Sequence, residues 1–476
     1  MDKYIIGVDN GSQSTKVMIF NQNGNVVVQA SEPLRPMMHR EPGWVEHPDD
    51  DLWDSVKNVL KTVMGKFKGD PAHIVGLGLC TIRCCRVFMK ADGSLAEPVM
   101  SWMDVRSYTP FKDRDDIAYT CPTTGYVTYK LTGEFKDTAA NAFQWQFPID
   151  VNTWQWSEDK RHFDNFKIPR EKLPQLQMPG TILGHVTAAA AAETGLPVGL
   201  PVVATGNDKA VEALGAGLVE KGIGLISCGT YMCSMVHGND YISDSTAFWT
   251  NLSCVPHEYL YESTGIRFGM RHVSWLKEIL GEEMDKIAQS QGLVLEEYLA
   301  GEAKDVPTGS GGVLIIPDWL APATDLHRKG IVLGLTDQTS RGHVYKAILE
   351  GIVLTIKNCY EAMTAELGIA PDKVIISGGG SNSSLMMQIY ADALGVTTTR
   401  NEINGAVSMG SAICAAVATG LYKDFREAVD NMVKQRDEFV PDADNHKIYT
   451  KINDGIYKHL PSLMEDILKQ AYEATL

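Results

Sequence analysis

The sequence predicts a chain of two α/β domains. Strand-like apolar runs alternate with segments of helical spacing through both halves of its 476 residues. A hairpin pattern with a turn rich in glycine and hydroxyl residues occurs near the N-terminus and again about 200 residues later, as an internal duplication would produce. A chain of this length is expected to hold two or more domains. We place the boundary near residues 215–222, which gives domains of 1–217 and 218–476.

The first hairpin pattern covers residues 4–20. Its turn, GVDNGSQSTK at residues 7–16, joins two apolar strands. A carboxylate at a strand end, followed by a glycine turn with small hydroxyl residues, can offer a ligand to a metal ion and backbone N–H groups to phosphate oxygens. Taken alone, such a turn is more often an ordinary β-hairpin. The rest of the chain decides between the two interpretations.

Two further glycine-containing turns favour a bound nucleotide. Residues 223–236, IGLISCGTYMCSMV, repeat the order of apolar strand, glycine turn with a hydroxyl residue, and apolar strand. Residues 377–382, SGGGSN, follow an apolar strand and precede a run with helical spacing. Glycines let the backbone approach a ligand closely, and the start of a helix presents free N–H groups to anions. Three such turns in one chain are typical of a nucleotide-binding protein.

Asp208 is the candidate for acid–base chemistry. It follows the strand-like run PVVATG at residues 201–206 and falls in the first turn of a helix that begins at Asn207. A carboxylate in the first turn commonly caps a helix. Spacing alone therefore favours a capping role for Asp208.

In order along the chain, these motifs resemble those of the FGGY carbohydrate kinases, a family of the actin/Hsp70/hexokinase superfamily that includes xylulokinases, glycerol kinase and ribulokinases. The most specific match lies at residues 330–350, where GIVLGL, seven residues, HV, two residues and AILE fit the family's C-terminal signature at every fixed position. The resemblance runs from about residue 4 to about residue 420. It implies an α/β fold of two ribonuclease-H-like (actin-like ATPase) domains, with an interdomain catalytic cleft that closes over sugar and ATP and excludes water.

The resemblance also implies roles for individual residues. Asp208 is expected to take the proton of the attacking sugar hydroxyl. Asp9 is expected to hold Mg²⁺, in part through water. The phosphates of ATP are expected to bind Gly11, Ser12, Gln13 and Lys16 in the first turn and Gly229 and Thr230 in the second, and the adenosine to bind Gly378, Gly379 and Asn382.

The expected sugar site departs from the family pattern. Residues 79–86, LCTIRCCR, stand where xylulokinases have Gln-Met-His and glycerol kinases have Gln-Arg-Glu, and only the arginine is kept. Residues 102–106 match the family's Trp-x-Asp-x-Arg. A tryptophan beside charged groups would suit a polyol with an apolar C–H face. The residues expected to bind the substrate are Arg83, Trp102, Asp104, Asn207 and Asp208.

A second departure lies between Arg106 and Tyr129, where this chain has about twenty residues and family members usually have considerably more. The family's N-terminal signature, around Lys-x-x-Trp, is missing with it. Either this segment is deleted, which would open the sugar pocket, or it is missing from the sequence.

The motifs together predict ATP-dependent phosphorylation of a terminal hydroxyl of a small ketose or polyol. A xylulose-like pentulose is favoured over glycerol or a tetritol, because Asn207-Asp208 resembles the xylulokinase form more than the Gly-Asp-Gln-Gln of glycerol kinase. An alternative of another class is a sugar-sensing ATPase or regulator with weak transfer activity. The presence of Asp208 speaks against a sensor, which needs no base.

The composition argues against other partners. With 43 basic and 59 acidic residues, the formal charge of -16 disfavours nucleic acid and anionic membranes. The chain leads from Met1 directly into a strand and has no apolar run near about 18 residues, so we expect a cytoplasmic protein without a membrane span. The expected partner is a small sugar or polyol. Family members are often dimers or tetramers, so a homo-oligomer is compatible with the sequence.

Overall fold

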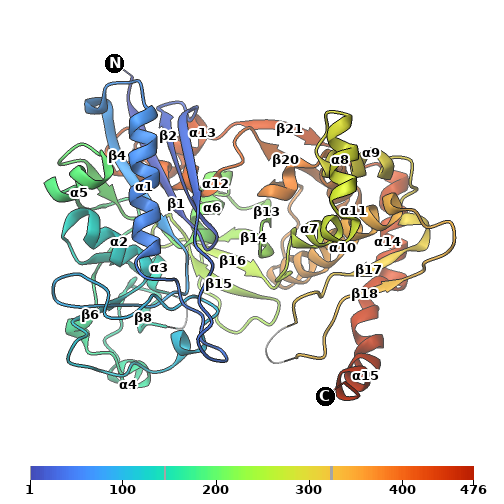
Figure 1. The fold of residues 1–476 in the computed structure, drawn as a ribbon, viewed down its shortest axis with the longest axis horizontal. Helices are drawn as coiled ribbons and strands as arrows, with labels where there is room; N and C mark the ends of the chain where they lie inside the picture. The colour runs from blue at the N-terminus through green and yellow to red at the C-terminus, as the bar shows by residue number, and fades with distance from the viewer. Residues whose placement is uncertain (1, 144–145, 322–324, 476) are drawn as a thin grey trace.

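The computed structural model describes residues 2–143, 146–321 and 325–475, which form two α/β halves side by side (Figure 1). Each half is built on one mixed sheet, and helices lie between the two sheets as well as on their outer faces. Within the described ranges, every helix is too short or too polar to cross a lipid bilayer. The arrangement confirms the predicted α/β fold of two halves.

The first sheet has six strands in the order β11-β12-β4-β1-β2-β3. The strands β1 to β3 are antiparallel, β4 and β12 run parallel to β1, and β11 is antiparallel to β12. The first predicted hairpin is therefore β1 and β2. The bounds are Tyr4–Asn10 for β1, Ser14–Asn21 for β2, Val26–Pro33 for β3, Ile74–Thr81 for β4, Ile182–His185 for β11 and Pro201–Val203 for β12.

The second sheet repeats this plan with one additional strand, in the order β15-β16-β14-β13-β19-β20-β21. Here β13 and β14 form the second predicted hairpin, β16 continues it antiparallel, and β19 and β20 run parallel to β13. The same succession of strand directions agrees with the predicted duplication. The bounds are Ile223–Cys228 for β13, Met232–Gly238 for β14, Phe248–Leu252 for β15, Tyr259–Ser263 for β16, Lys373–Ser377 for β19, Thr397–Asn401 for β20 and Gln435–Phe439 for β21.

Two helices, α6 (Asp208–Ala216) and α12 (Ala406–Ala418), pack against each other in a core that both sheets share. The outer face of the first sheet packs on α1 (Asp51–Lys66), α2 (Thr123–Thr132) and α5 (Ala188–Thr194). Because α12 belongs to the second half of the chain and packs on the first sheet, the expected division into 1–217 and 218–476 stays a prediction.

Glycines allow the close approach of α12. A Cβ atom on Gly7 or Gly78 of the first sheet would lie 1.8 Å from a backbone oxygen of α12. A Cβ on Gly215 of α6 would lie 1.8 Å from the backbone oxygen of Ala406, and one on Gly410 would lie 2.0 Å from that of Val211. The helices and the sheet therefore meet backbone to backbone, at distances that no other residue type permits.

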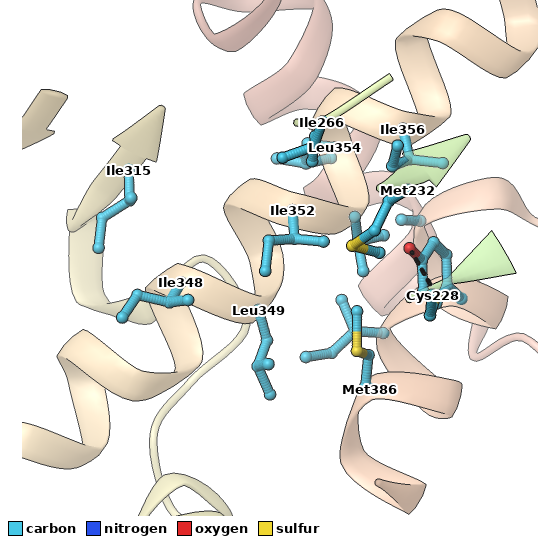
Figure 2. Packing of buried hydrophobic residues seen from close by; sticks show 14 of the residues in the cluster. Cys228, Met232, Ile266, Ile315, Ile348, Leu349, Ile352, Leu354, Ile356 and Met386 are labelled. Carbon is cyan, nitrogen blue, oxygen red and sulfur yellow. Dashed lines mark hydrogen bonds between the residues drawn. The ribbon is translucent and has the colours of Figure 1, made fainter. Parts of the chain in front are cut away.

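The outer face of the second sheet is covered by α10 (Arg341–Leu367) and α11 (Ser384–Leu394). Figure 2 shows side chains of α10, such as Ile348 and Ile352, between Ile315 of β17 (Leu314–Ile316) and the strand ends that carry Cys228 and Met232. The helix begins with a capping box in which His343 pairs with Ser340. The signature at 330–350 thus comprises strand β18 (Ile331–Leu333) and the start of a core helix, whose N-cap Ser340 pairs with His343 in the capping box.

The remaining described elements are shorter or lie at the surface of the two halves. They are β5 (Val87–Met89), β6 (Tyr119–Cys121), β7 (Lys136–Thr138), α3 (Ala139–Ala142), β8 (Ile149–Asp150), β9 (Gln155–Trp156), α4 (Lys160–Phe166), β10 (Gln175–Gln177), α7 (Arg271–Leu280), α8 (Glu282–Ser290), α9 (Leu295–Ala303), β18 (Ile331–Leu333), α13 (Phe425–Met432), α14 (Ala443–Gly455) and α15 (Leu460–Glu473).

We expect Gly410→Ala to destabilise the protein by about 3 kcal/mol, because the added methyl group would meet the rigid backbone of α6. The matched control is Gly301→Ala in α9, where no atom lies within 4 Å of the added Cβ. That control should be neutral or stabilising by up to about 1 kcal/mol. Thermal unfolding of both variants measures the difference, and equal melting temperatures would contradict the close packing of α12.

Candidate active site

A cleft of about 490 Å³ lies between the two sheets and is lined by residues from both halves. Residues that the sequence predicted for catalysis, for phosphate binding and for sugar binding all line this cleft. The lining residues are Asp9, Gly11, Ser12, Gln13, Ser14, Ile82, Arg83, Cys84, Trp102, Tyr108, Asp208, Lys209, Glu212, Thr230, Tyr231, Trp249, Arg267 and Val407.

Parallel strands explain why distant parts of the first half meet in this cleft. Asp9 near the end of β1 is in register with Cys80 near the end of β4, and β12 runs parallel beside β4. Arg83 follows β4, and Asp208 follows β12. Because the carboxyl ends of parallel strands lie at one edge of a sheet, their following residues share that edge.

Asn207, and not Asp208, caps helix α6. The Asn207 side chain accepts hydrogen bonds from the backbone N–H groups of Lys209 and Ala210, both at 3.1 Å, and donates to the carbonyl of Ala140. Asp208 is the first residue of the helix, and its carboxylate accepts a hydrogen bond from the backbone N–H of Lys209 at 2.9 Å. The first-turn position that the spacing predicted is therefore confirmed, while the N-cap itself is Asn207. The Asp208 carboxylate faces the cleft and is 32% exposed.

Arg83 links Asp208 to a carboxylate of the second sheet. The Arg83 Nε atom lies 3.4 Å from Asp208 Oδ1. Its two terminal nitrogens donate to Glu262 at 2.8 and 2.7 Å. Glu262, on β16, is fully buried and also accepts hydrogen bonds from Trp249 and Asn251. The ion pair therefore joins the edge of the first sheet to the second sheet across the cleft.

The pKa values of the two carboxylates beside Arg83 shift in opposite directions. Burial raises the pKa of Asp208, and the positive charge of Arg83 offsets only part of that effect. Burial acts in the same direction on Glu262, but the closer Arg83 contacts outweigh it and lower the pKa of Glu262. Glu262 therefore stays ionised, while Asp208 is the carboxylate with the higher proton affinity.

A second contact between the halves involves Lys209, the residue after Asp208. The Lys209 ammonium donates to Glu212 Oε2 at 3.0 Å and to the hydroxyl of Ser227 at 2.6 Å, and that hydroxyl donates to Glu212 at 2.8 Å. Ser227 lies near the end of β13, directly before the second glycine turn. The start of α6 is thus fixed against the second hairpin.

Asp9 has more negatively than positively charged side chains around it. Burial raises its pKa to about 7, Lys16 opposes that effect, and Asp208 and Glu212 add to it. Among the described residues there is no group of three or more His, Cys, Asp or Glu that could hold a metal ion alone. A single half-buried carboxylate with unfavourable carboxylate neighbours fits Mg²⁺, which keeps several waters and takes its other ligands from substrate phosphates.

The second glycine turn and the glycine cluster lie next to each other. Ser227 of β13 and Ser377 of β19 are in register on parallel strands. A Cβ on Gly378, whose φ is +84°, would lie 3.2 Å from the backbone nitrogen of Gly229. Of the residues expected to bind ATP, Lys16, Gly229, Gly378, Gly379 and Asn382 lie outside the lining of the cleft.

Two residues expected to bind the substrate have structural contacts instead. Asn207 is the buried cap described above. Asp104 is also fully buried, accepts a hydrogen bond from the backbone of Val45 at 2.8 Å, and pairs with Arg106 at 2.6 Å. Neither residue lines the cleft. Trp102 does line it, beside Tyr108, whose hydroxyl donates to the Trp102 carbonyl at 2.9 Å.

The short segment after Arg106 forms a packed connection. Phe111 and Ile117 are buried in a core with Phe88 and Trp154, and the chain then enters β6. Tyr108, at the start of this connection, reaches the cleft. The structure thus accommodates the short segment without exposing the core of the first half.

Sequence patterns missed several lining residues. Glu262 is the only carboxylate in the apolar strand sequence YLYES, and a charge in such a run was an available signal. Trp249, on the neighbouring strand β15, lies opposite Glu262 in the register of the sheet. Glu212, Tyr231 and Arg267 lie near motifs but carry no pattern of their own, so only the fold reveals their place in the cleft.

Comparisons with known proteins identify the family of this chain. A model of the N-terminal domain of the FGGY family of carbohydrate kinases matches residues 4–115 and 112–215, and a model of that family's C-terminal domain matches residues 224–419. The two N-terminal pieces meet within the short segment. The uncharacterized sugar kinase YgcE of Escherichia coli (strain K12) is 46% identical over 472 residues, which cover 99% of this chain and 96% of that protein.

Two further similar proteins have names that give different substrates. A glycerol kinase of Haemophilus influenzae is 26% identical over 94% of both chains. The crystal structure of a xylulose kinase from Rhodospirillum rubrum superposes with a TM-score of 0.81 at 24% identity, covering 98% of this chain and 100% of that one. The fold is thus shared with the xylulose kinase structure, while the names of these two relatives give different acceptors, glycerol and xylulose.

We expect Glu262→Gln to destabilise the protein by about 3 kcal/mol, because it leaves the buried Arg83 charge without its main partner. The control is Glu278→Gln, which removes an exposed ion pair with Arg271 and should cost less than about 1 kcal/mol. Thermal unfolding compares the two. If both variants melted alike, the ion pair would not be a major link between the halves.

The raised pKa of Asp9 predicts a loss of stability with rising pH. Its ordinary value is 3.8 and its value in the fold is about 7, so between these values the folded state binds more protons than the unfolded state. Asp9→Asn should therefore leave stability almost unchanged near pH 4 and raise it by up to about 4 kcal/mol above pH 7. Thermal unfolding with a chelator, at several pH values, measures this. A variant with the same pH dependence as the wild type would refute the shift.

Proposed function

Because the chain belongs to the FGGY family of carbohydrate kinases, and is thus a phosphotransferase that acts on a sugar hydroxyl, we propose that it transfers the γ-phosphoryl group of ATP to a terminal hydroxyl of a small ketose or polyol. A xylulose-like pentulose is the favoured acceptor. The observation that carries the proposal is the Asp208 carboxylate, which is partly exposed in a cleft that both glycine turns also line.

Asp208 is the proposed base. A carboxylate with a raised pKa accepts the proton of an attacking hydroxyl more readily than an ordinary one. Arg83 holds the carboxylate in place through its Nε contact. Its terminal nitrogens are bound to Glu262, so in this role Arg83 positions the base and does not need to bind the sugar.

The phosphate side of the cleft is proposed to comprise both glycine turns. Gly11, Ser12 and Gln13 face the cleft from the first half, and Thr230 faces it from the second. Lys16 lies in β2 opposite Asp9, and Gly229 begins the second turn directly after β13. Asp9 would hold Mg²⁺, which when bound would offset the charge of the phosphates.

The adenosine is proposed to bind the glycine cluster. Gly378 lies against the second turn, and Gly379 and Asn382 begin and end the 3₁₀ turn that precedes α11. Arg400 fixes this turn by donating to the carbonyls of Ser381 at 2.7 Å and Asn382 at 3.2 Å. A rigid backbone near the phosphate turns suits a nucleoside that extends out of the cleft.

The sugar end is proposed to lie among Trp102, Tyr108 and Trp249. Their rings offer apolar faces to the C–H groups of a sugar. A cleft of about 490 Å³ has room for a pentulose beside the phosphate tail of a nucleotide. The family resemblance of Asn207-Asp208 to xylulokinases supports a pentulose, although Asn207 itself acts as the helix cap.

Of the two alternatives, only a different acceptor has support of its own. Similarity to glycerol kinases along 94% of the chain favours glycerol or a tetritol as the acceptor. A sugar-sensing ATPase with weak transfer would need no base, and the position of Asp208 in the cleft argues against it. Release of ADP with ATP and Mg²⁺, measured across ketoses, sugar acids and polyols and without sugar, separates these possibilities. Strong stimulation by a pentulose supports the proposal, and sugar-independent turnover contradicts it.

We expect Asp208→Asn to lower kcat by about 10²-fold or more, because an amide cannot accept the proton. ATP binding should change little. The control is Asp444→Asn, which changes an exposed aspartate in the first turn of α14 and should leave kcat unchanged. Steady-state kinetics and calorimetric titration of ATP measure both effects. Near-normal turnover of Asp208→Asn would remove Asp208 from the role of base.

A further inference from the structure

Arg267 lies in the cleft and belongs to none of the motifs that the sequence pattern singled out. It is exposed and stands in the loop between β16 and α7. Among the described residues, no carboxylate lies within ion-pair distance of its guanidinium group, although Asp9, Asp208 and Glu212 line the same cleft. The other two cations of the lining, Arg83 and Lys209, are both engaged by carboxylates.

The loop that carries Arg267 is fixed to the second glycine turn on both sides. Before Arg267, Ile266 and Met232 exchange backbone hydrogen bonds of 2.9 and 3.0 Å. After it, Met270 donates to the carbonyl of Gly229 at 3.3 Å. A Cβ on Gly269 would lie 2.2 Å from that carbonyl oxygen. Arg267 is therefore attached to the wall that holds Gly229 and Thr230.

The hydrophobic core makes this attachment rigid. Figure 2 shows Ile266 and Met232 among the buried side chains that pack around α10. Both are almost fully buried, whereas the next residue, Arg267, is exposed to the cleft. A long cation on a fixed backbone can reach a ligand with little loss of backbone freedom.

We propose that Arg267 binds the phosphoryl group in transit between ATP and the substrate. The inference rests on the proposed function. In that reaction the substrate oxygen forms a bond to the γ-phosphorus, the bond from that phosphorus to the bridging oxygen of ADP breaks with its electron pair staying on ADP, and the hydroxyl proton moves to Asp208. The planar guanidinium can donate two hydrogen bonds to phosphoryl oxygens as their charge redistributes.

Position favours a phosphoryl group over a substrate carboxylate. Both flanks of Arg267 contact the turn that contains Gly229 and Thr230, and the facing wall carries the first turn, Gly11 to Ser14. A substrate carboxylate bound by Arg267 would have to lie at this phosphate end of the cleft. A cation there offsets the negative charge that Asp9, Asp208 and Glu212 would otherwise present to ATP.

The test compares Arg267→Gln and Arg267→Lys with Arg271→Gln. Arg271, four residues later on α7, is exposed and paired with Glu278, so its loss should leave kcat unchanged. For Arg267→Gln we expect kcat to fall about 100-fold or more. Arg267→Lys should recover part of this loss, because an ammonium keeps the charge without the bidentate geometry.

Nucleotide titrations provide a readout that does not need turnover. ATP should bind Arg267→Gln several-fold more weakly than wild type, while AMP, which lacks the β- and γ-phosphates, should bind both equally. Unchanged kcat and ATP affinity in Arg267→Gln would overturn the inference. A loss confined to sugar acids, with neutral polyols unaffected, would assign Arg267 to a substrate carboxylate and also overturn it. If the wild type bound no ATP, the proposed function itself would fail.

Discussion

The close packing of α12 on the first sheet is the constraint on which the site depends. Backbone contacts at Gly7, Gly78, Gly215 and Gly410 bring a helix from the second half of the chain against β1, β4 and α6. These contacts leave no room for adjustment, because backbone atoms cannot rotate out of the way as side chains do. They therefore fix the position of α6, and with it Asp208, relative to both sheets.

Charge balance is the second organising feature of the cleft. Burial raises the pKa of Asp9 to about 7, and the nearby Asp208 and Glu212 carboxylates add to this effect. Arg83 pairs with Asp208 and, across the two halves, with Glu262, while Lys209 pairs with Glu212 within α6. The surplus that remains suits a site whose ligand arrives with a divalent cation, since phosphates and carboxylates alone would repel each other.

The same contacts join the halves and shape the chemistry. The Arg83–Glu262 pair and the Lys209–Ser227 hydrogen bond both cross from the first half to the second. A relative movement of the halves would stretch these contacts and change the environment of Asp208 directly. In the proposed mechanism, closure of the cleft would therefore change the setting of Asp208 through Arg83, its neighbour in space, and Lys209, its neighbour in sequence.

The sequence by itself determined the features that depend on local pattern. Alternating strands and helices, the two hairpins, the glycine cluster and the signature at 330–350 are each contained in a short segment, and they sufficed to predict the α/β fold and the family. The position of Asp208 after a buried strand was readable in the same way, because strand ends and helix starts are local features.

Only the tertiary structure decided which side chains meet. Arg83 and Glu262 are 179 residues apart, and no local pattern reports such a pair. Asp104 and Asn207 matched family motifs, yet their hydrogen bonds place them in the supporting wall and at a helix cap. Arg267 lies in the cleft because backbone hydrogen bonds hold its loop against the second glycine turn. Side-chain roles of this kind depend on long-range packing, which sequence spacing does not encode.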